Sequence, residues 1–314
     1  MRKRAGSHLH QAPVMDLISH ITLLGGACST AELTRLCSRA DIERALNAGV
    51  LNRVARGRYA LASASRAVRT AAAHSGTLSM RSAAQQHGWG QRKEPRIPDV
   101  TFPRNRRVER TARRVLVPHW SDLPDADVEN GTTTKRRTLI DCMRNLPLAD
   151  SVPIVDSAVR AGDITTRELR RMAAAMKGRG RARAMAVAAM ASSKPANAFE
   201  SSLRAIASTI PGLRVEPQRT LRIASERDLR PDFIDERLGI VIEAESFEWH
   251  GDRRALSRDC TRYNILSTAG WIVVRFSWEQ VILAPAYVVE VLVRAVRLAR
   301  QHANVAAGAI QRSA

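Results

Sequence analysis

The chain has 314 residues, which is enough for two or three domains with buried cores. No apolar run approaches the ~20 residues of a membrane span, and no apolar segment follows the basic start MRKRAGSHLHQAP, so the sequence indicates neither a membrane partner nor a signal peptide. The four cysteines show no CxxC spacing, which argues against a zinc site or a disulfide framework. We therefore expect a cytoplasmic protein.

Positive charge is the strongest feature of the composition. The chain holds 50 Lys and Arg against 30 Asp and Glu, a net charge of +20. Residues 1–120 carry 21 basic and 7 acidic side chains, an excess of 14, whereas residues 200–300 carry 15 and 14. An arginine-biased proteome could raise the total, but it would not concentrate the excess in the first third. Arginine suits phosphate recognition, so we expect DNA as a partner.

Residues 10–63 show three helical segments followed by a hairpin. MDLISHITLLGG predicts a helix that ends at the paired glycines 25–26. Ser29 and Glu32 form a capping-box pattern that starts a second helix. RADIERALNAG predicts a third helix, stopped by Gly49, and VLNRVARGRYAL predicts two short strands around a turn.

Three helices and a basic hairpin are typical of a winged helix-turn-helix DNA-binding domain. In that domain the third helix lies in the major groove and the hairpin reaches the backbone. The expected DNA contacts come from the third helix and the hairpin: Arg39, Arg44, Arg53, Arg56 and Arg58. Small units of this kind also bind proteins, and that alternative stays open.

Residues 64–190 predict a mostly helical middle region. Two β-like segments, 97–102 and 115–118, flank the arginine run RNRRVERTARR. The segment KGRGRARA (177–184) is interpreted as a linker or a phosphate-contacting turn, and SSKPAN (192–197) as a domain boundary. Helices are expected near residues 66–74, 80–88, 138–146, 152–162 and 165–176.

Residues 196–300 show the clearest pattern of the chain. The helix AFESSLRAIAST is followed by three strands, LRVEPQRTLRI, RPDFIDE and LGIVIEAES. Then come the helix RRALSRDCTRYNILSTAG, the strand WIVVRFSW and a closing helix over 281–299. This order is αβββαβ with an extra helix, a mixed sheet flanked by helices, and it makes the fold class of the whole chain α/β.

Three carboxylates converge at one end of that predicted sheet. Alternation places Glu243 and Glu245 on the same face, and the turn after RPDFIDE brings Asp232 beside Glu243. Close negative charges repel one another, and a hard divalent cation such as Mg²⁺ (or Mn²⁺) relieves the repulsion. His250 lies five residues beyond Glu245, where it can act as a general acid/base or contact a phosphate. Alternatively, the acids pair with arginines: Arg230, Arg254, Arg258 or Arg275.

The run Pro231-Asp232, followed after ten residues by Glu243-Ala-Glu245, resembles the PD-(D/E)xK nuclease motif. With Glu200 before it and His250, Asp259, Arg262, Gly270-Trp271 and Arg275 after it, residues 196–300 resemble bacterial domains related to very-short-patch-repair endonucleases. This resemblance implies a restriction-endonuclease-like fold.

The same resemblance also implies roles for particular residues. Asp232 and Glu243 would be metal ligands, His250 a catalytic or phosphate-contacting group, and Glu200 a supporting carboxylate. The lysine position of the motif is Glu245 here, which would orient the attacking water. A lysine's positive charge, which would stabilise the transition state, is therefore missing at that position.

The first half of the chain resembles the AbiEi-type antitoxins of type IV toxin–antitoxin systems. The likeness covers residues 10–175 and is carried by paired glycines 25–26, STAEL (29–33), residues 45–51 and RGRYAL (56–61). It implies sequence-directed DNA binding, repression and a cognate toxin as a further partner, without catalysis. Two functions therefore stay open: a Mg²⁺-dependent DNA endonuclease, or a repressor or antitoxin whose nuclease-like domain is weak or inactive.

Overall fold

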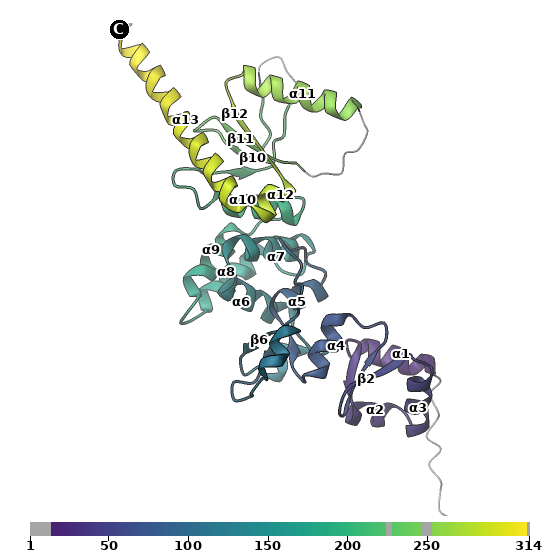
Figure 1. The fold of residues 1–314 in the computed structure, drawn as a ribbon. Helices are drawn as coiled ribbons and strands as arrows, with labels where there is room; N and C mark the ends of the chain where they lie inside the picture. Colours follow the sequence, from purple (N-terminus) through teal and green to yellow (C-terminus); the bar gives the residue numbers. More distant parts are fainter. Residues whose placement is uncertain (1–13, 224–227, 246–252, 313–314) are drawn as a thin grey trace, which may run out of the picture. The chain divides into compact units, whose positions relative to one another are not determined.

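The computed structural model describes residues 14–223, 228–245 and 253–312 (Figure 1). It confirms a mixed α/β protein. The chain divides into two compact units: the first contains Met1–Gly88 and Glu94–Asp141, and the second contains Trp89–Lys93 and Cys142–Ala314. In the part of the chain that the structure describes, no helix combines the length and apolarity needed to cross a membrane.

The first unit begins with the three expected helices and the expected hairpin. A third strand, which the sequence did not predict, pairs with the hairpin, so the antiparallel sheet has the order β1-β3-β2. Ser29 and Glu32 form the expected capping box, and Ser38 and Asp41 form a second one. The elements are α1 (Val14–Leu23), β1 (Ala27–Ser29), α2 (Thr30–Leu36), α3 (Arg39–Asn47), β2 (Leu51–Ala55) and β3 (Arg58–Leu61).

The rest of the first unit is built on a five-stranded sheet of order β6-β5-β4-β8-β7. Both β-like segments of the middle region are strands, and β5 and β6 run parallel. Three strands of only two residues each were not predicted, because such short segments carry no periodic pattern. The elements are α4 (Arg66–Ala73), β4 (Thr77–Leu78), α5 (Met80–Gln86), β5 (Asp99–Phe102), η1 (Arg110–Arg114), β6 (Val117–Trp120), η2 (Asp125–Asp127), β7 (Val128–Glu129) and β8 (Thr132–Thr133).

Helices of the middle region open the second unit. Residues 181–184, expected as part of a linker or turn, instead form the first turn of a helix, and only the residues before them are irregular. Residues 192–197 lie inside this unit. A buried ion pair joins Asp156, which precedes this segment, to Arg204, which follows it, at a distance of 2.7 Å. The helices are α6 (Lys135–Asn145), which begins in the first unit, α7 (Leu148–Arg160), α8 (Thr166–Ala175), α9 (Arg181–Met190) and α10 (Ala198–Ala207).

A four-stranded sheet of order β12-β11-β10-β9 ends the second unit. The central strands β10 and β11 are antiparallel, and β12 lies parallel to β11. The segment expected to form one closing helix forms two, α12 and α13. Pro285 has no amide hydrogen to continue the first helix, so the second helix begins at that residue. The elements are β9 (Glu216–Pro217), β10 (Phe233–Asp235), β11 (Ile240–Glu245), α11 (Arg253–Thr268), β12 (Ile272–Ser277), α12 (Trp278–Leu283) and α13 (Pro285–Arg312).

The expected strand LRVEPQRTLRI is much shorter than predicted. Only Glu216–Pro217 is a strand, and an isolated bridge joins Leu221 to Leu229. Pro217 cannot donate to a strand ladder, and Gln218 has a φ of 53°, so the extended backbone ends there. The backbone amide of Gln218 still donates to the Asp232 carbonyl at 2.9 Å, so Gln218 stays beside Asp232.

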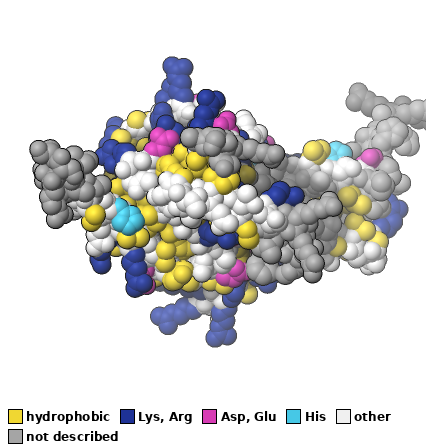
Figure 2. All heavy atoms as spheres, turned by 90° about the horizontal axis from the view of Figure 1, so that it is seen from above, with side chains coloured by type: hydrophobic (Ala, Val, Ile, Leu, Met, Phe, Trp, Pro, Cys, Tyr) yellow, Lys and Arg dark blue, Asp and Glu magenta, His cyan; other side chains and the backbone are white. Residues whose placement is uncertain are grey.

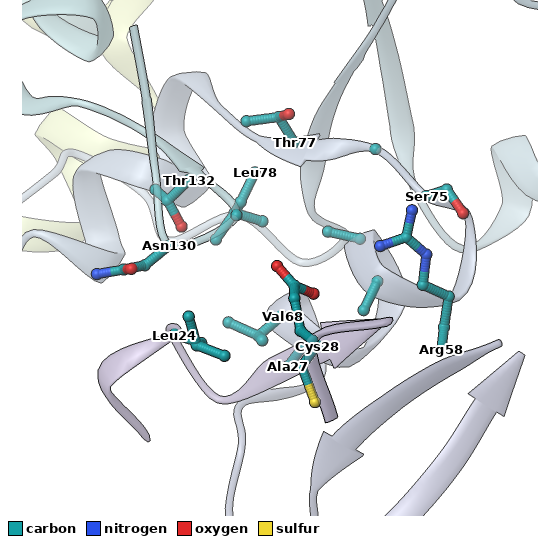
Figure 3. Close-up of a pocket in the computed structure, with 15 residues that line it drawn as sticks. Leu24, Ala27, Cys28, Arg58, Val68, Ser75, Thr77, Leu78, Asn130 and Thr132 are labelled. Carbon is teal, nitrogen blue, oxygen red and sulfur yellow. The ribbon is translucent and has the colours of Figure 1, made fainter. Parts of the chain in front are cut away.

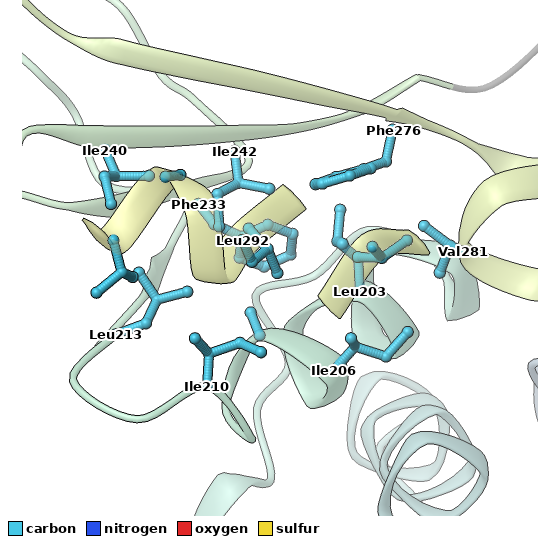
Figure 4. Packing of buried hydrophobic residues seen from close by; sticks show 14 of the residues in the cluster. Leu203, Ile206, Ile210, Leu213, Phe233, Ile240, Ile242, Phe276, Val281 and Leu292 are labelled. Carbon is cyan, nitrogen blue, oxygen red and sulfur yellow. The ribbon is translucent and has the colours of Figure 1, made fainter. Parts of the chain in front are cut away.

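The alternating pattern of β11 separates two apolar layers. Ile240 and Ile242 pack with Phe276 and with Leu292 of α13 on one face of the sheet (Figure 4). Val241 packs with Leu266 of α11 on the other face. Glu243 continues the Val241 side, so it lies under α11 rather than in the larger core.

Candidate functional site

Asp232 and Glu243 meet at the end of the two central strands. In the antiparallel register Phe233 lies opposite Ile242, which places Asp232 opposite Glu243 at the next position. The backbone amide of Asp232 donates to Glu243 Oε2 at 3.2 Å, and the amide of Ala244 donates to Asp232 Oδ2 at 2.8 Å. The expected juxtaposition of these two carboxylates is confirmed.

Glu243 is a buried acid with a cationic partner. Its exposure is 3%, and Arg262 of α11 approaches its Oε1 with Nη2 at 2.7 Å. Burial raises the pKa of Glu243 to about 8. The positive charge of Arg262 lowers this pKa in part, and the negative charge of Asp232 raises it further. Arg262 is one of the residues that resemble the domains related to very-short-patch-repair endonucleases, but the sequence gave no reason to pair it with Glu243.

Glu200 joins this site through an amide that the sequence did not single out. Nε2 of Gln218 donates to Asp232 Oδ1 at 3.1 Å and lies 3.4 Å from Glu200 Oε2. Glu200 stands in the first turn of α10, where the amide of Ala196 donates to it at 2.8 Å. Burial raises the pKa of Glu200, and the charge of Asp232 acts in the same direction. Gln218 therefore links the supporting carboxylate to the central one.

Glu245 is bound by two groups from neighbouring elements. Arg275 Nε of β12 donates to Glu245 Oε1 at 2.8 Å, and the Tyr263 hydroxyl of α11 donates to the same oxygen. The Arg275 guanidinium also lies over the Tyr263 ring, 3.8 Å from its centroid. Burial would raise the pKa of Glu245, but the hydrogen bonds from Arg275 and Tyr263 outweigh it and hold that pKa below its usual value.

The arginine-pairing alternative is thus realised at Glu245, through Arg275. At Glu243 the pairing exists with a different arginine, Arg262. His250, expected as an acid/base or phosphate contact, lies outside the described residues. Its role stays a prediction.

Asp232 and Glu243 have the chemistry of a hard-cation site. The two oxygens of Asp232 accept hydrogen bonds from uncharged donors, the Gln218 amide and the Ala244 backbone. No cluster of three or more His, Cys, Asp and Glu side chains within the described ranges is placed to hold a metal ion. A pair of carboxylates nevertheless fits Mg²⁺, which keeps several waters and takes its remaining oxygens from a substrate phosphate.

The helix arginines expected to contact DNA lie on α3. The Arg39 side chain is 93% exposed and lies 3.5 Å from Glu43 one turn on. Arg44 is paired with Asp41. The exposed Arg39–Glu43 pair contributes little to stability and leaves the Arg39 guanidinium able to reorient towards a phosphate.

The hairpin arginines differ from one another in their surroundings. Arg53 is exposed and donates to the Tyr59 hydroxyl at 3.1 Å, and Arg56 is exposed at the turn. Arg58 instead lines a cavity of about 320 Å³, opposite Asn130 (Figure 3). Glu32 also lines this cavity, but its carboxylate is held by Ser29 in the capping box.

Basic side chains dominate the charged groups of the molecular surface. Figure 2 shows Lys and Arg projecting around the visible face with fewer acidic side chains among them, as the net charge of +20 requires. Such a surface attracts polyanions.

Comparisons with known proteins show no family for this chain. No protein-family model matches the sequence, and neither does any curated protein. Among solved structures, the crystal structure of the RV2827C protein from Mycobacterium tuberculosis is similar at a TM-score of 0.31 and 14% identity, covering 70% of this chain and 92% of that one.

Proposed function

We propose that the protein binds DNA through its basic first unit and hydrolyses phosphodiester bonds at the Asp232–Glu243 pair in its second unit. The observation that carries the proposal is the meeting of these two carboxylates on adjacent strands, with Glu243 only 3% exposed. A buried acid such as Glu243 beside a second carboxylate is costly to keep unless it has a use. Residues 10–63 would be the winged helix-turn-helix domain and residues 196–300 the restriction-endonuclease-like domain.

Asp232 and Glu243 would hold the divalent cation. When bound, such an ion lowers the pKa of a coordinated water and neutralises charge that develops on the phosphate. Gln218 fixes the orientation of Asp232 through its amide. Both described hydrogen bonds to Glu245 use Oε1, which leaves Oε2 to orient the attacking water. Arg262 supplies positive charge beside the site, where the motif's lysine is missing.

A second function is favoured by a specific contact. Arg262 bound to Glu243 at 2.7 Å and Arg275 bound to Glu245 at 2.8 Å already give both glutamates a hydrogen-bonding partner without an ion. This arrangement favours a repressor or antitoxin that uses the second unit only to dock on DNA or on a cognate toxin.

A plasmid-nicking assay separates the two functions. Parent protein is incubated with supercoiled plasmid and Mg²⁺ or Mn²⁺ beside Asp232→Asn, Glu243→Gln and the control Glu290→Gln, an exposed acid on α13. Metal-dependent nicking by the parent and the control, and by neither site variant, supports hydrolysis. If all four proteins bind the plasmid and none nicks it, the hydrolytic function is refuted and the regulator is favoured.

A further inference from the structure

A dense arginine cluster is formed by residues that belong neither to the carboxylate pair nor to α3 nor to the hairpin. The connection between β5 and β6 holds six arginines and one glutamate within residues 104–114, a net charge of +5. We call this segment, together with Trp120, the arginine–tryptophan surface. Its arginines are Arg104, Arg106, Arg107, Arg110, Arg113 and Arg114.

The backbone of this segment is held in place by the core of the first unit. Ala112 is 5% exposed and Leu116 is fully buried, and both pack in the cluster that contains Phe102. The Trp120 indole donates to the carbonyl of Arg106 at 3.0 Å, and this ties the segment to the edge strand β6. The segment is therefore an anchored loop that presents its arginines outwards.

Most of this charge is not neutralised by neighbouring acids. Arg104 lies 3.8 Å from Asp122, and both of those side chains are mostly exposed. Arg107, Arg110 and Arg114 are exposed and have no hydrogen-bond or ion-pair partner within the described ranges. Like charges held this close repel one another, so a polyanion that binds them removes an unfavourable interaction.

The tryptophan gives the surface an exposed apolar element. Trp120 is 42% exposed, and the Arg113 guanidinium lies 5.8 Å from its ring centroid. Arginine forks match phosphate oxygens in pairs, and a guanidinium that lies over an aromatic ring is attracted to that ring. The arginines stand on a loop and on the single short 3-10 helix η1, not on an α-helix or a two-stranded ribbon long enough to enter the major groove, so we expect them to face a backbone rather than base edges.

We propose that the arginine–tryptophan surface binds the phosphate backbone of duplex DNA without regard to its sequence. It is a contact additional to those expected from α3 and the hairpin, and it rests on the proposed function of DNA binding. A backbone contact adds affinity and salt dependence but no sequence preference.

The test measures duplex affinity at several salt concentrations by fluorescence anisotropy, in EDTA so that no cleavage occurs. The triple variant Arg107→Gln, Arg110→Gln, Arg114→Gln is compared with a control of equal charge loss on α8, Arg167→Gln, Arg170→Gln, Arg171→Gln, whose arginines are also exposed. Each phosphate contact contributes about 0.9 to the slope of log K against log salt, so losing three flattens it by about 2.7. We expect this flattening in the triple variant and little change in the control.

Three results would overturn the inference. If both triple variants change the slope equally, the loss reflects net charge and not this surface, while DNA binding by the chain stands. If the surface variant loses affinity for duplex RNA but not for DNA, the ligand is assigned wrongly. If the parent has no affinity for duplex DNA, this inference and the proposed function fall together. A matching Arg→Lys triple variant keeps the charge and should keep the slope, which separates lost phosphate contacts from a folding defect.

Discussion

Glu243 allows a test of the site that needs neither DNA nor a metal ion. Its pKa is raised from 4.5 to about 8, chiefly by burial. In the unfolded chain the same carboxyl releases its proton near the ordinary value. Between these two values folding takes up a proton, so this group makes the protein less stable as pH rises through the window. At 1.36 kcal/mol per pH unit, the loss accumulated from pH 4.5 to pH 7 is about 3 kcal/mol.

Glu243→Gln removes the titrating group and keeps the shape of the side chain. In EDTA at pH 7 we expect the variant to have a larger free energy of unfolding than the parent, by about 2 kcal/mol. This figure is the ~3 kcal/mol from the titration less ~1 kcal/mol for a hydrogen bond that one amide cannot replace. Near pH 4.5 the advantage should disappear, because the carboxyl of the parent is then protonated in the folded chain and already half protonated in the unfolded chain, so little titration cost is left.

The assay is urea denaturation followed by circular dichroism from pH 4.5 to pH 8. Glu290→Gln is the control, since its side chain is 57% exposed and its titration should not affect stability comparably. Parallel pH profiles for the parent and Glu243→Gln would refute the reasoning, because Glu243 would then titrate alike in the folded and unfolded chains. Mg²⁺ should stabilise the parent more than Glu243→Gln, since an ion that binds only the folded state adds to stability.

The other predictions concern the scaffold that holds the site. Arg204→Met should lower the free energy of unfolding by about 3–5 kcal/mol in urea denaturation, because it leaves the Asp156 carboxylate, which is 0% exposed, without its cation. A loss below about 1 kcal/mol would show that Asp156 and Arg204 do not form a buried ion pair. Ser29→Ala should cost about 1 kcal/mol through the lost helix cap. Hydrogen bonds from Ser29 lower the pKa of Glu32, so their stabilisation is present above its ordinary value of 4.5 and lost as pH falls through the lowered one. The variant should therefore lose less stability on acidification than the parent. If urea denaturation shows the same loss of stability at low pH for both proteins, the Ser29–Glu32 hydrogen bonds do not contribute to it.

The sequence predicted the parts of the site that depend on local pattern. Alternation along β11 fixed which side of the sheet Glu243 faces, and the short turn before it set the register that brings Asp232 alongside. The capping box of Ser29 is likewise a pattern within four residues, and it is present as expected. Local rules suffice where both partners lie in one strand pair or one helical turn.

The groups that surround the acids could not be predicted in this way. Gln218 reaches Asp232 because the strand before it breaks at Pro217, and nothing in the sequence shows where its amide then points. Arg262 and Tyr263 reach the sheet from α11, so their contacts depend on how that helix lies across the strands. Several arginines were plausible partners for the glutamates, and only the packing of distant elements selects among them.

The hydrolytic and the regulatory function differ in what balances the charge of Glu243. Arg262 occupies one oxygen of Glu243 and the backbone amide of Asp232 the other, whereas Asp232 itself meets only uncharged donors in the hydrogen bonds described. Arg262 is 30% exposed at its side chain whereas Glu243 is buried, so the arginine can turn to solvent only if another cation takes its place beside the glutamate. A cation arriving with a phosphate would then compete with an arginine that can itself turn to the phosphate. Because that exchange keeps every charge paired, the Arg262 contact is compatible with an enzyme at rest as well as with a protein that only docks on DNA.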